Sequence, residues 1–177
     1  MRRPPYERGV TRHALVDVPS GLRAEERSVE VPETARPAVS ALIRSWEFKR
    51  RAGFGTPDAA PKEGQEGRLS KRVLGVRFSE PIRVVWASEH GFGYETRPGH
   101  PLYGEESFVL DDGVFTARSI SRPATLLWVV LAPALRWMQR STHDRYIAIV
   151  SAEVRRCIDS GRGPAGRGSG VRPGNPK

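Results

Sequence analysis

His100, Glu105 and Glu106 are the side chains whose types and spacing are best suited to chemistry. The Pro98-Gly99 pair is typical of a type II turn, and a residue before proline, here His100, stays extended. This geometry would bring His100 close to Glu105 or Glu106, and a carboxylate would orient the imidazole as a general base or metal ligand. No second histidine has usable spacing, so no metal site is predicted. The alternative, which we favour, is a structural turn whose acids pair with Arg97 or Arg122.

A second set of polar residues could hold the head of an otherwise apolar ligand. Its members are Arg83, Tyr94, Arg122, Gln139 and Tyr146. Strand alternation sets Arg83 opposite Ile82 and Val84, and Arg122 stands at a predicted strand-to-helix junction, where anions bind. Gln139 and Tyr146 are seven residues apart and therefore share a helix face. Ion pairs for the arginines and core packing for the tyrosine are the competing interpretations, and we favour them.

Other chemistries lack their motifs. The chain contains no GxSxG, P-loop, HExxH or GxGxxG pattern. A single cysteine and four histidines provide no zinc ligand set and no internal disulfide, which argues for a reducing compartment. Cys157 has no evident base beside it. No organic cofactor is therefore predicted.

The elements that would position these residues follow from hydrophobic periodicity. A short strand is predicted over residues 28–31, followed by a helix with Pro37 in its first turn and a loop over 53–67. Val39, Leu42, Ile43 and Trp46 share one face of that helix. Five runs of strand character then occupy residues 69–78, 82–87, 92–96, 107–110 and 114–120. Turn residues separate them, including 79–81 and the hairpin signal Asp111-Asp112-Gly113.

Helical periodicity returns after the predicted strands. Ser121 is a candidate cap, Pro123 suits a first turn, and Pro133 should kink or split the segment. The run 126–135 is too short to span a bilayer and is interpreted as a buried helix segment. The apolar stripe of the predicted C-terminal helical segment consists of Leu127, Val130, Leu131, Ala134, Leu135 and Met138.

The element order predicts an α+β fold, in which a curved antiparallel sheet with an early helix is crossed by a long C-terminal helix. This is the helix-grip arrangement of lipid-transfer and polyketide-cyclase-like proteins. A plain α+β sandwich without a cavity has the same element order, and the sequence does not separate the two.

The cluster of unusual residues between 92 and 124 resembles the uncharacterised protein family 0548, a domain of unknown function. The resemblance covers about residues 28–155, and Glu95 and Arg97 depart from the family pattern. It implies the fold and no established activity. The residues that carry it are Phe92-Gly93-Tyr94, Thr96, Pro98-Gly99-His100-Pro101, Gly104-Glu105-Glu106, Phe108, Ser121-Arg122-Pro123-Ala124, Gln139 and Arg145-Tyr146, with weaker agreement at Trp46 and Pro81-Ile82-Arg83-Val84-Val85.

The charge of the chain is concentrated at its ends. Of the formal net charge of +9, residues 161–177 hold +4 and residues 1–12 hold +3, which leaves +2 for residues 13–160. We therefore expect a flexible basic N-terminus over 1–12, one domain over 13–160 and a disordered Gly/Pro/Arg-rich tail over 161–177. No signal peptide or membrane span is predicted, which favours a cytoplasmic protein.

Three functions compete at this point. The leading one is binding of a small apolar or amphipathic molecule in a cavity between the sheet and the C-terminal helix. The second is an enzyme, a hydrolase or isomerase, that uses His100 with Glu105 and Glu106. The third is association with nucleic acid through the basic ends, which the nearly balanced domain argues against. The oligomeric state stays open.

Overall fold

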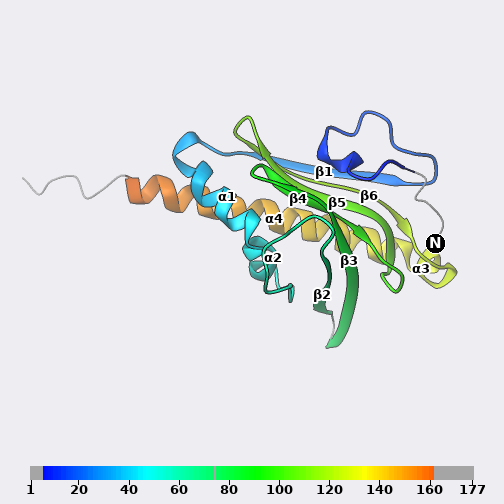
Figure 1. Cartoon of the computed structure of the whole chain (residues 1–177). Helices are drawn as coiled ribbons and strands as arrows, with labels where there is room; N and C mark the ends of the chain where they lie inside the picture. The colour runs from blue at the N-terminus through cyan, green and yellow to red at the C-terminus, as the bar shows by residue number, and fades with distance from the viewer. Residues whose placement is uncertain (1–5, 74, 162–177) are drawn as a thin grey trace, which may run out of the picture.

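The computed structural model of the chain describes residues 6–73 and 75–161. One six-stranded antiparallel sheet forms its centre, in the order β1-β6-β5-β4-β3-β2 (Figure 1). The strands are β1 (Arg23–Glu30), β2 (Glu66–Val73), β3 (Val76–Ser88), β4 (Gly91–Thr96), β5 (Leu102–Asp111) and β6 (Val114–Pro123). From β2 to β6 each strand pairs with the next along the chain, so the predicted meander is confirmed.

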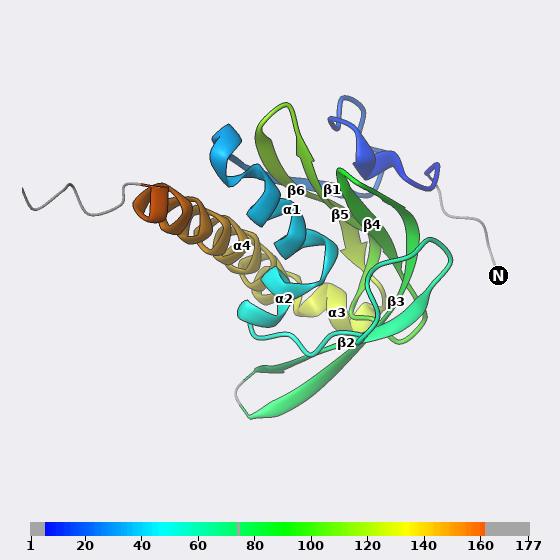
Figure 2. The same ribbon diagram turned by 60° about the vertical axis from the view of Figure 1, so that its left-hand side comes forward.

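The helices are placed mainly on one side of this sheet. They are η1 (Val10–Arg12), η2 (Glu33–Ala35), α1 (Arg36–Arg44), α2 (Glu47–Arg51), α3 (Leu126–Val130) and α4 (Ala132–Gly161). Figure 2 shows α4 running alongside α1 and α2, with α3 at its N-terminal end. This is the predicted fold: an early helix, a curved antiparallel sheet and a long C-terminal helix packed across it.

Two predicted turns have the backbone that their residues favour. Asp112 and Gly113 both have positive φ (46° and 76°) and join Asp111 to its partner Val114 in a tight hairpin. Gly99 has φ 98°, and the N–H of His100 donates to the carbonyl of Arg97. This second turn delivers His100 to the start of β5.

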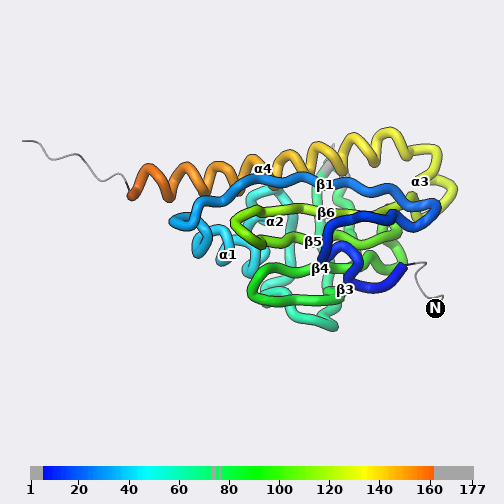
Figure 3. Tube along the Cα trace, turned by 90° about the horizontal axis from the view of Figure 1, so that it is seen from above, coloured from blue at the N-terminus to red at the C-terminus, as the bar shows by residue number. Residues whose placement is uncertain are grey.

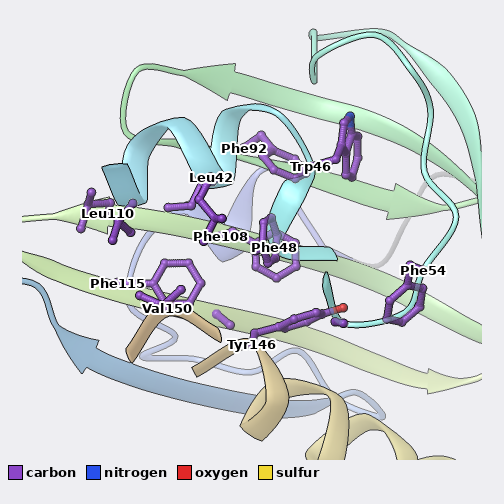
Figure 4. Packing of buried hydrophobic residues seen from close by; sticks show 14 of the residues in the cluster. Leu42, Trp46, Phe48, Phe54, Phe92, Phe108, Leu110, Phe115, Tyr146 and Val150 are labelled. Carbon is purple, nitrogen blue, oxygen red and sulfur yellow. The ribbon is translucent and has the colours of Figure 1, made fainter. Parts of the chain in front are cut away.

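The core is an aromatic cluster enclosed by the sheet, α2 and α4. The ring of Phe48 lies 4.6 Å from that of Phe108 and 5.2 Å from that of Tyr146, measured between ring centroids. Figure 4 shows Tyr146 extending from α4 beside Phe48 and Phe54. The predicted helix with Pro37 in its first turn is broken at Trp46, whose backbone is left-handed (φ 62°). This break changes the direction of the residues that follow it.

The first hairpin differs from its prediction. Residues 69–78 are not one strand, because the chain turns at Gly75, where φ is 81°, between β2 and β3. The expected turn at 79–81 lies inside β3, where Pro81 stands opposite Arg68. Glycine supplied the positive φ that the turn needs, and the Ser-Glu-Pro pattern was misleading.

The junction between the sheet and the C-terminal helices also differs. Ser121 and Pro123 are the end of β6 rather than a cap and a first turn, and α3 begins at Leu126 after Thr125. Pro133 lies in the first turn of α4, so the predicted split of the segment is confirmed. The expected burial of residues 126–135 is wrong for most of them, since only Leu135 is buried.

The N-terminal segment packs against the face of the sheet opposite α4. Thr11 is fully buried, and its carbonyl accepts a hydrogen bond of 2.6 Å from Ser107 Oγ of β5. Viewed from above, this segment lies over the middle of the sheet (Figure 3). The expectation of a loose N-terminus is therefore wrong for residues 6–12. The expectations for residues 1–5 and for the tail from 162 onward lie outside the described residues.

Candidate functional site

A cavity of about 130 Å³ lies between the concave face of the sheet and α4. Most of its wall is apolar or aromatic, and one end is polar. The apolar lining consists of Phe54, Phe78, Pro101, Leu102, Gly104, Ile120, Trp128, Leu135 and Met138, and the polar lining of Lys49, Lys71, Glu80, Tyr94, Thr96, His100, Glu105, Glu106, Ser119, Ser121, Gln139, Thr142, His143 and Tyr146.

Lys49 is the cation at the polar end, and it is fully buried. Its Nζ donates to Tyr94 Oη at 2.7 Å, to Tyr146 Oη at 2.8 Å and to Glu106 Oε2 at 3.2 Å. An ammonium has three donors, so all of them are used. Burial lowers the pKa of Lys49 below its ordinary value, and the charge of Glu106 offsets part of that shift. The left-handed backbone at Trp46 turns α2 so that this lysine enters the core.

Glu106 of β5 is the anion that balances Lys49. It also accepts hydrogen bonds from Tyr94 Oη and, at 2.9 Å, from His143 Nε2 of α4. Burial opposes ionisation of Glu106, but the charge of Lys49 and the hydrogen bonds from His143 and Tyr94 outweigh it and hold its pKa well below the ordinary value. Its side chain keeps 18% of its surface accessible and lines the cavity, and both carboxylate oxygens accept hydrogen bonds.

His143 is oriented by this carboxylate. Because Glu106 is ionised and can only accept, the proton of His143 sits on Nε2. Its Nδ1 is buried and has no hydrogen-bond partner among the described residues.

His100 is neutral and keeps one N–H group free to donate. Its Nδ1 accepts the N–H of Leu102 at 2.9 Å, so the proton is on Nε2, which lies 3.7 Å from Glu80 Oε2. Burial lowers the pKa of His100 to about 4. Burial raises the pKa of Glu80, because it disfavours the charged carboxylate. Lys71, which also lines the cavity, donates from Nζ to Thr142 Oγ1 at 3.0 Å.

The residues predicted from sequence divide between the two faces of the sheet. Tyr94, His100, Glu106, Gln139 and Tyr146 line the cavity. The amide of Gln139 also donates to Ser119 Oγ at 2.8 Å. Members of two residue sets that were predicted separately from the sequence therefore line one cavity.

Glu105, Arg83 and Arg122 do not join the polar end of the cavity. Although Glu105 borders the cavity, its carboxylate accepts from Gly9 N at 2.9 Å and from Thr11 Oγ1 at 2.6 Å, on the opposite face. Arg83 stands beside Glu95 in the ladder and is absent from the cavity wall. The guanidinium of Arg122 lies 5.1 Å from the centre of the Tyr103 ring. Strand alternation separates Glu105 from Glu106, and it contradicts the expected convergence of His100 with both acids.

The polar residues that were not predicted from the sequence include Lys49, Glu80 and His143. Lys49 lies three residues beyond Trp46 and so continues the apolar stripe of the first helix, which was the available signal. His143 lies eight residues after Leu135 and three before Tyr146, also on a buried stripe. Glu80 gave no such signal, since its segment resembled a turn.

The fold and the cavity together define a helix-grip domain. Residues 6–149 match the family described as domain of unknown function DUF1990, and the chain belongs to that family. The expected membership of a family of unknown function on this fold is thereby confirmed. A search of curated proteins found no match.

Solved structures of low sequence identity share the fold. TTHA0849 from Thermus thermophilus has a TM-score of 0.51 at 12% identity, with 76% of this chain and 97% of that chain covered. Ms6760 from Mycobacterium smegmatis has a TM-score of 0.52 at 11% identity, with 77% and 91% covered. The di-domain ARO/CYC StfQ from the steffimycin biosynthetic pathway has a TM-score of 0.55 at 13% identity, with 78% and 52% covered. At such identities the likeness concerns the fold alone.

Proposed function

We propose that the protein binds a small apolar or amphipathic molecule, with its apolar part between the sheet and α4 and its polar end at Glu106 and His100. The observation that supports this most is the pairing of an apolar wall with a carboxylate that three donors hold in place and that lines the cavity. We also propose the finer family assignment, to uncharacterised protein family 0548.

The volume of the cavity bounds the size of the buried part. An engineered apolar cavity of about 150 Å³ in another protein holds benzene. A cavity of about 130 Å³ therefore suits one aromatic ring or a short branched chain. A longer ligand would extend along the wall formed by Trp128 and Leu135.

Charge balance at the polar end favours a neutral head group. The charges of Lys49 and Glu106 compensate each other in an ion pair. Burial lowers the pKa of Lys71, and the negative charge of Glu80 opposes that shift. The groups offered to a ligand include the Nε2–H of His100 and the remaining N–H groups of Lys71 as donors, and the carboxylates of Glu106 and Glu80 as acceptors. A hydroxyl, which both donates and accepts, satisfies these groups best, so we expect an alcohol or phenol.

Binding is a better proposal than acid–base catalysis for a physical reason. His100 offers no free lone pair, because Nδ1 is used by Leu102 and Nε2 carries the proton. Glu106 is a weak base, since its pKa is held low. Glu105 directs its carboxylate to the other face. The expected catalytic trio therefore lacks a competent base in this geometry.

The test is calorimetric titration of the full chain with p-cresol, a one-ring phenol. We expect saturable binding to the natural protein and a loss of at least tenfold in affinity for Leu135→Trp, which fills the cavity. Leu131→Trp, one helical turn earlier and exposed, is the matched control and should bind as the natural protein does. Absence of p-cresol binding, together with native mass spectra free of any copurified small molecule, would contradict the proposal.

A further inference from the structure

The surface beside the cavity carries an apolar patch that folding leaves exposed. It consists of Leu126, Leu127, Val129, Val130, Leu131 and Trp137, whose exposed fractions run from 42% to 86%. These residues belong to α3, to the α3–α4 junction and to the first turns of α4. A run of large apolar side chains that contributes nothing to the core is typical of an interaction surface.

The surroundings of the patch are cationic. Between Asp112 and Asp144 the chain contains no acidic residue and four arginines, at 118, 122, 136 and 140. Arg118 and Arg140 form ion pairs with Glu26 and Glu25 of β1. Arg122 and Arg136 have no carboxylate partner among the described residues, and both border a surface groove that Val129 also lines. Two uncompensated cations therefore flank the apolar side chains.

We propose that this patch docks on an anionic lipid bilayer, with its leucine, valine and tryptophan side chains in the interfacial layer and Arg122 and Arg136 against lipid phosphates. An apolar surface with a tryptophan and flanking arginines suits the boundary between acyl chains and head groups. No helix of the described residues is long and apolar enough to cross a membrane, so the protein would lie on the bilayer and not span it.

Charge complementarity decides between a bilayer and a second copy of the chain. A two-fold self-association through this patch would bring Arg122 and Arg136 towards their own copies. The groove beside the patch contains Glu25, but Arg140 already pairs with it. The lipid phosphates of an anionic bilayer supply negative charge for both arginines. The leucines and valines enter the apolar layer beneath and need no polar partner.

The same segment also forms part of the cavity wall. Trp128, in the middle of α3, faces the cavity and contacts the ring of Phe78, while its neighbours Leu127 and Val129 face outward. Docking would place the apolar phase of the bilayer against this wall. An apolar ligand could then pass between bilayer and cavity without entering water, a step that rests on the proposed function.

The experiment compares two exposed valines in sedimentation with vesicles. Val130, 77% exposed, lies in the patch, and Val16, 87% exposed, lies in the N-terminal segment on the other side of the sheet. We expect the full chain to sediment with phosphatidylcholine–phosphatidylglycerol vesicles. Val130→Glu should weaken this binding at least tenfold and Val16→Glu should not, because only one valine enters the bilayer.

Charge variants test the second half of the proposal. Arg122→Gln and Arg136→Gln should each weaken binding to the mixed vesicles about fivefold and leave the weaker binding to pure phosphatidylcholine unchanged. Equal sedimentation of Val130→Glu and Val16→Glu would overturn the proposal, since the basic ends would then account for binding. A natural protein that fails to sediment, or a dimer that Val130→Glu converts to monomer, would overturn it too. Titration with p-cresol without vesicles reports on the cavity alone, so the two proposals fail separately.

Discussion

Two adjacent carboxylates of β5 have opposite surroundings. Glu105 faces the N-terminal segment, where backbone N–H groups of Gly9 and Thr11 and the hydroxyl of Thr11 donate to it. Glu106 faces α4 and the cavity, where the donors are the side chains of Lys49, Tyr94 and His143. Burial raises the pKa of Glu105 despite its neutral donors, whereas the cation beside Glu106 lowers its pKa.

The difference separates attachment from binding. The N–H and O–H groups of Gly9 and Thr11 supply enough hydrogen bonds for Glu105, whose carboxylate only holds the N-terminal segment in place. A carboxylate with its own buried cation stays ionised within an apolar wall, where we propose that it meets a ligand. The two faces of one strand therefore serve different purposes, and the pairs of variants below test that division.

The largest effect is expected for Glu106→Gln. The change leaves the charge of Lys49 buried without a counter-ion, which costs about 3–5 kcal/mol of unfolding free energy. Chemical denaturation at neutral pH measures it. The double variant Lys49→Met/Glu106→Gln is the control and should regain most of the loss, because both charges are gone. A double variant no more stable than Glu106→Gln would show that the charge is not the cause.

Acidification should reveal the buried neutral histidine on the cavity face. The pKa of His100 is about 4 in the folded protein against an ordinary 6.5, so the unfolded chain takes up a proton that the folded one refuses. Stability is therefore lost as pH falls from 6.5 to 4, by about 3 kcal/mol from this residue. Denaturation at pH 7 and pH 4 should show a smaller difference for His100→Gln. Titration of the His100 ring near pH 6.5 by NMR would refute the expectation.

A smaller effect is expected for Glu105→Gln. The amide keeps one oxygen for Thr11, but its NH2 cannot accept from the N–H of Gly9, so one hydrogen bond and the charge assistance of the others are lost, at a cost of about 1–2 kcal/mol. The same denaturation experiment measures it beside Glu106→Gln. A loss as large as that of Glu106→Gln would erase the distinction between the two faces.

The smallest effect concerns the arginines that the sequence nominated for ligand binding. Arg83→Ala and Arg122→Ala should change the affinity for p-cresol less than twofold, because neither side chain lines the cavity. His100→Leu, which removes the donor inside the cavity, is the contrasting variant and should weaken affinity by about tenfold. A clear loss for either arginine would place the ligand on a different surface.

The fold could be predicted from the sequence because its signals are local. Periodicity located the strands from 92 to 120, and Asp112-Gly113 and Pro98-Gly99 located their turns. The first hairpin was misplaced because Gly75, alone among apolar residues, is a weaker signal than Ser-Glu-Pro. The burial of residues 126–135 was misjudged because hydrophobicity alone does not say whether the core or a partner covers a helix.

The site could be predicted only in part, because several of its residues are of charged types that usually lie at the protein surface. Lysine is rarely buried, and Lys49 follows a backbone break at Trp46 that no sequence pattern announced. Tyr94, His100, Glu106, Gln139 and Tyr146 were found because they lie in a conspicuous motif or on a helical face. Which of two adjacent acids faces inward depends on register, which the sequence did not settle.

The 30-residue length of α4 separates two residues that can carry spectroscopic signals. Trp137 stands near its start and Cys157, the chain's single cysteine, stands twenty residues later, about 30 Å along the axis. The other tryptophans, Trp46, Trp86 and Trp128, would first be replaced by phenylalanine. An acceptor dye on Cys157 and the emission of Trp137 would then report from opposite ends of α4. A surface approached at the α3 end would change the spectrum of the tryptophan and leave that of the dye unaltered, which makes the direction of contact readable from a single labelled molecule.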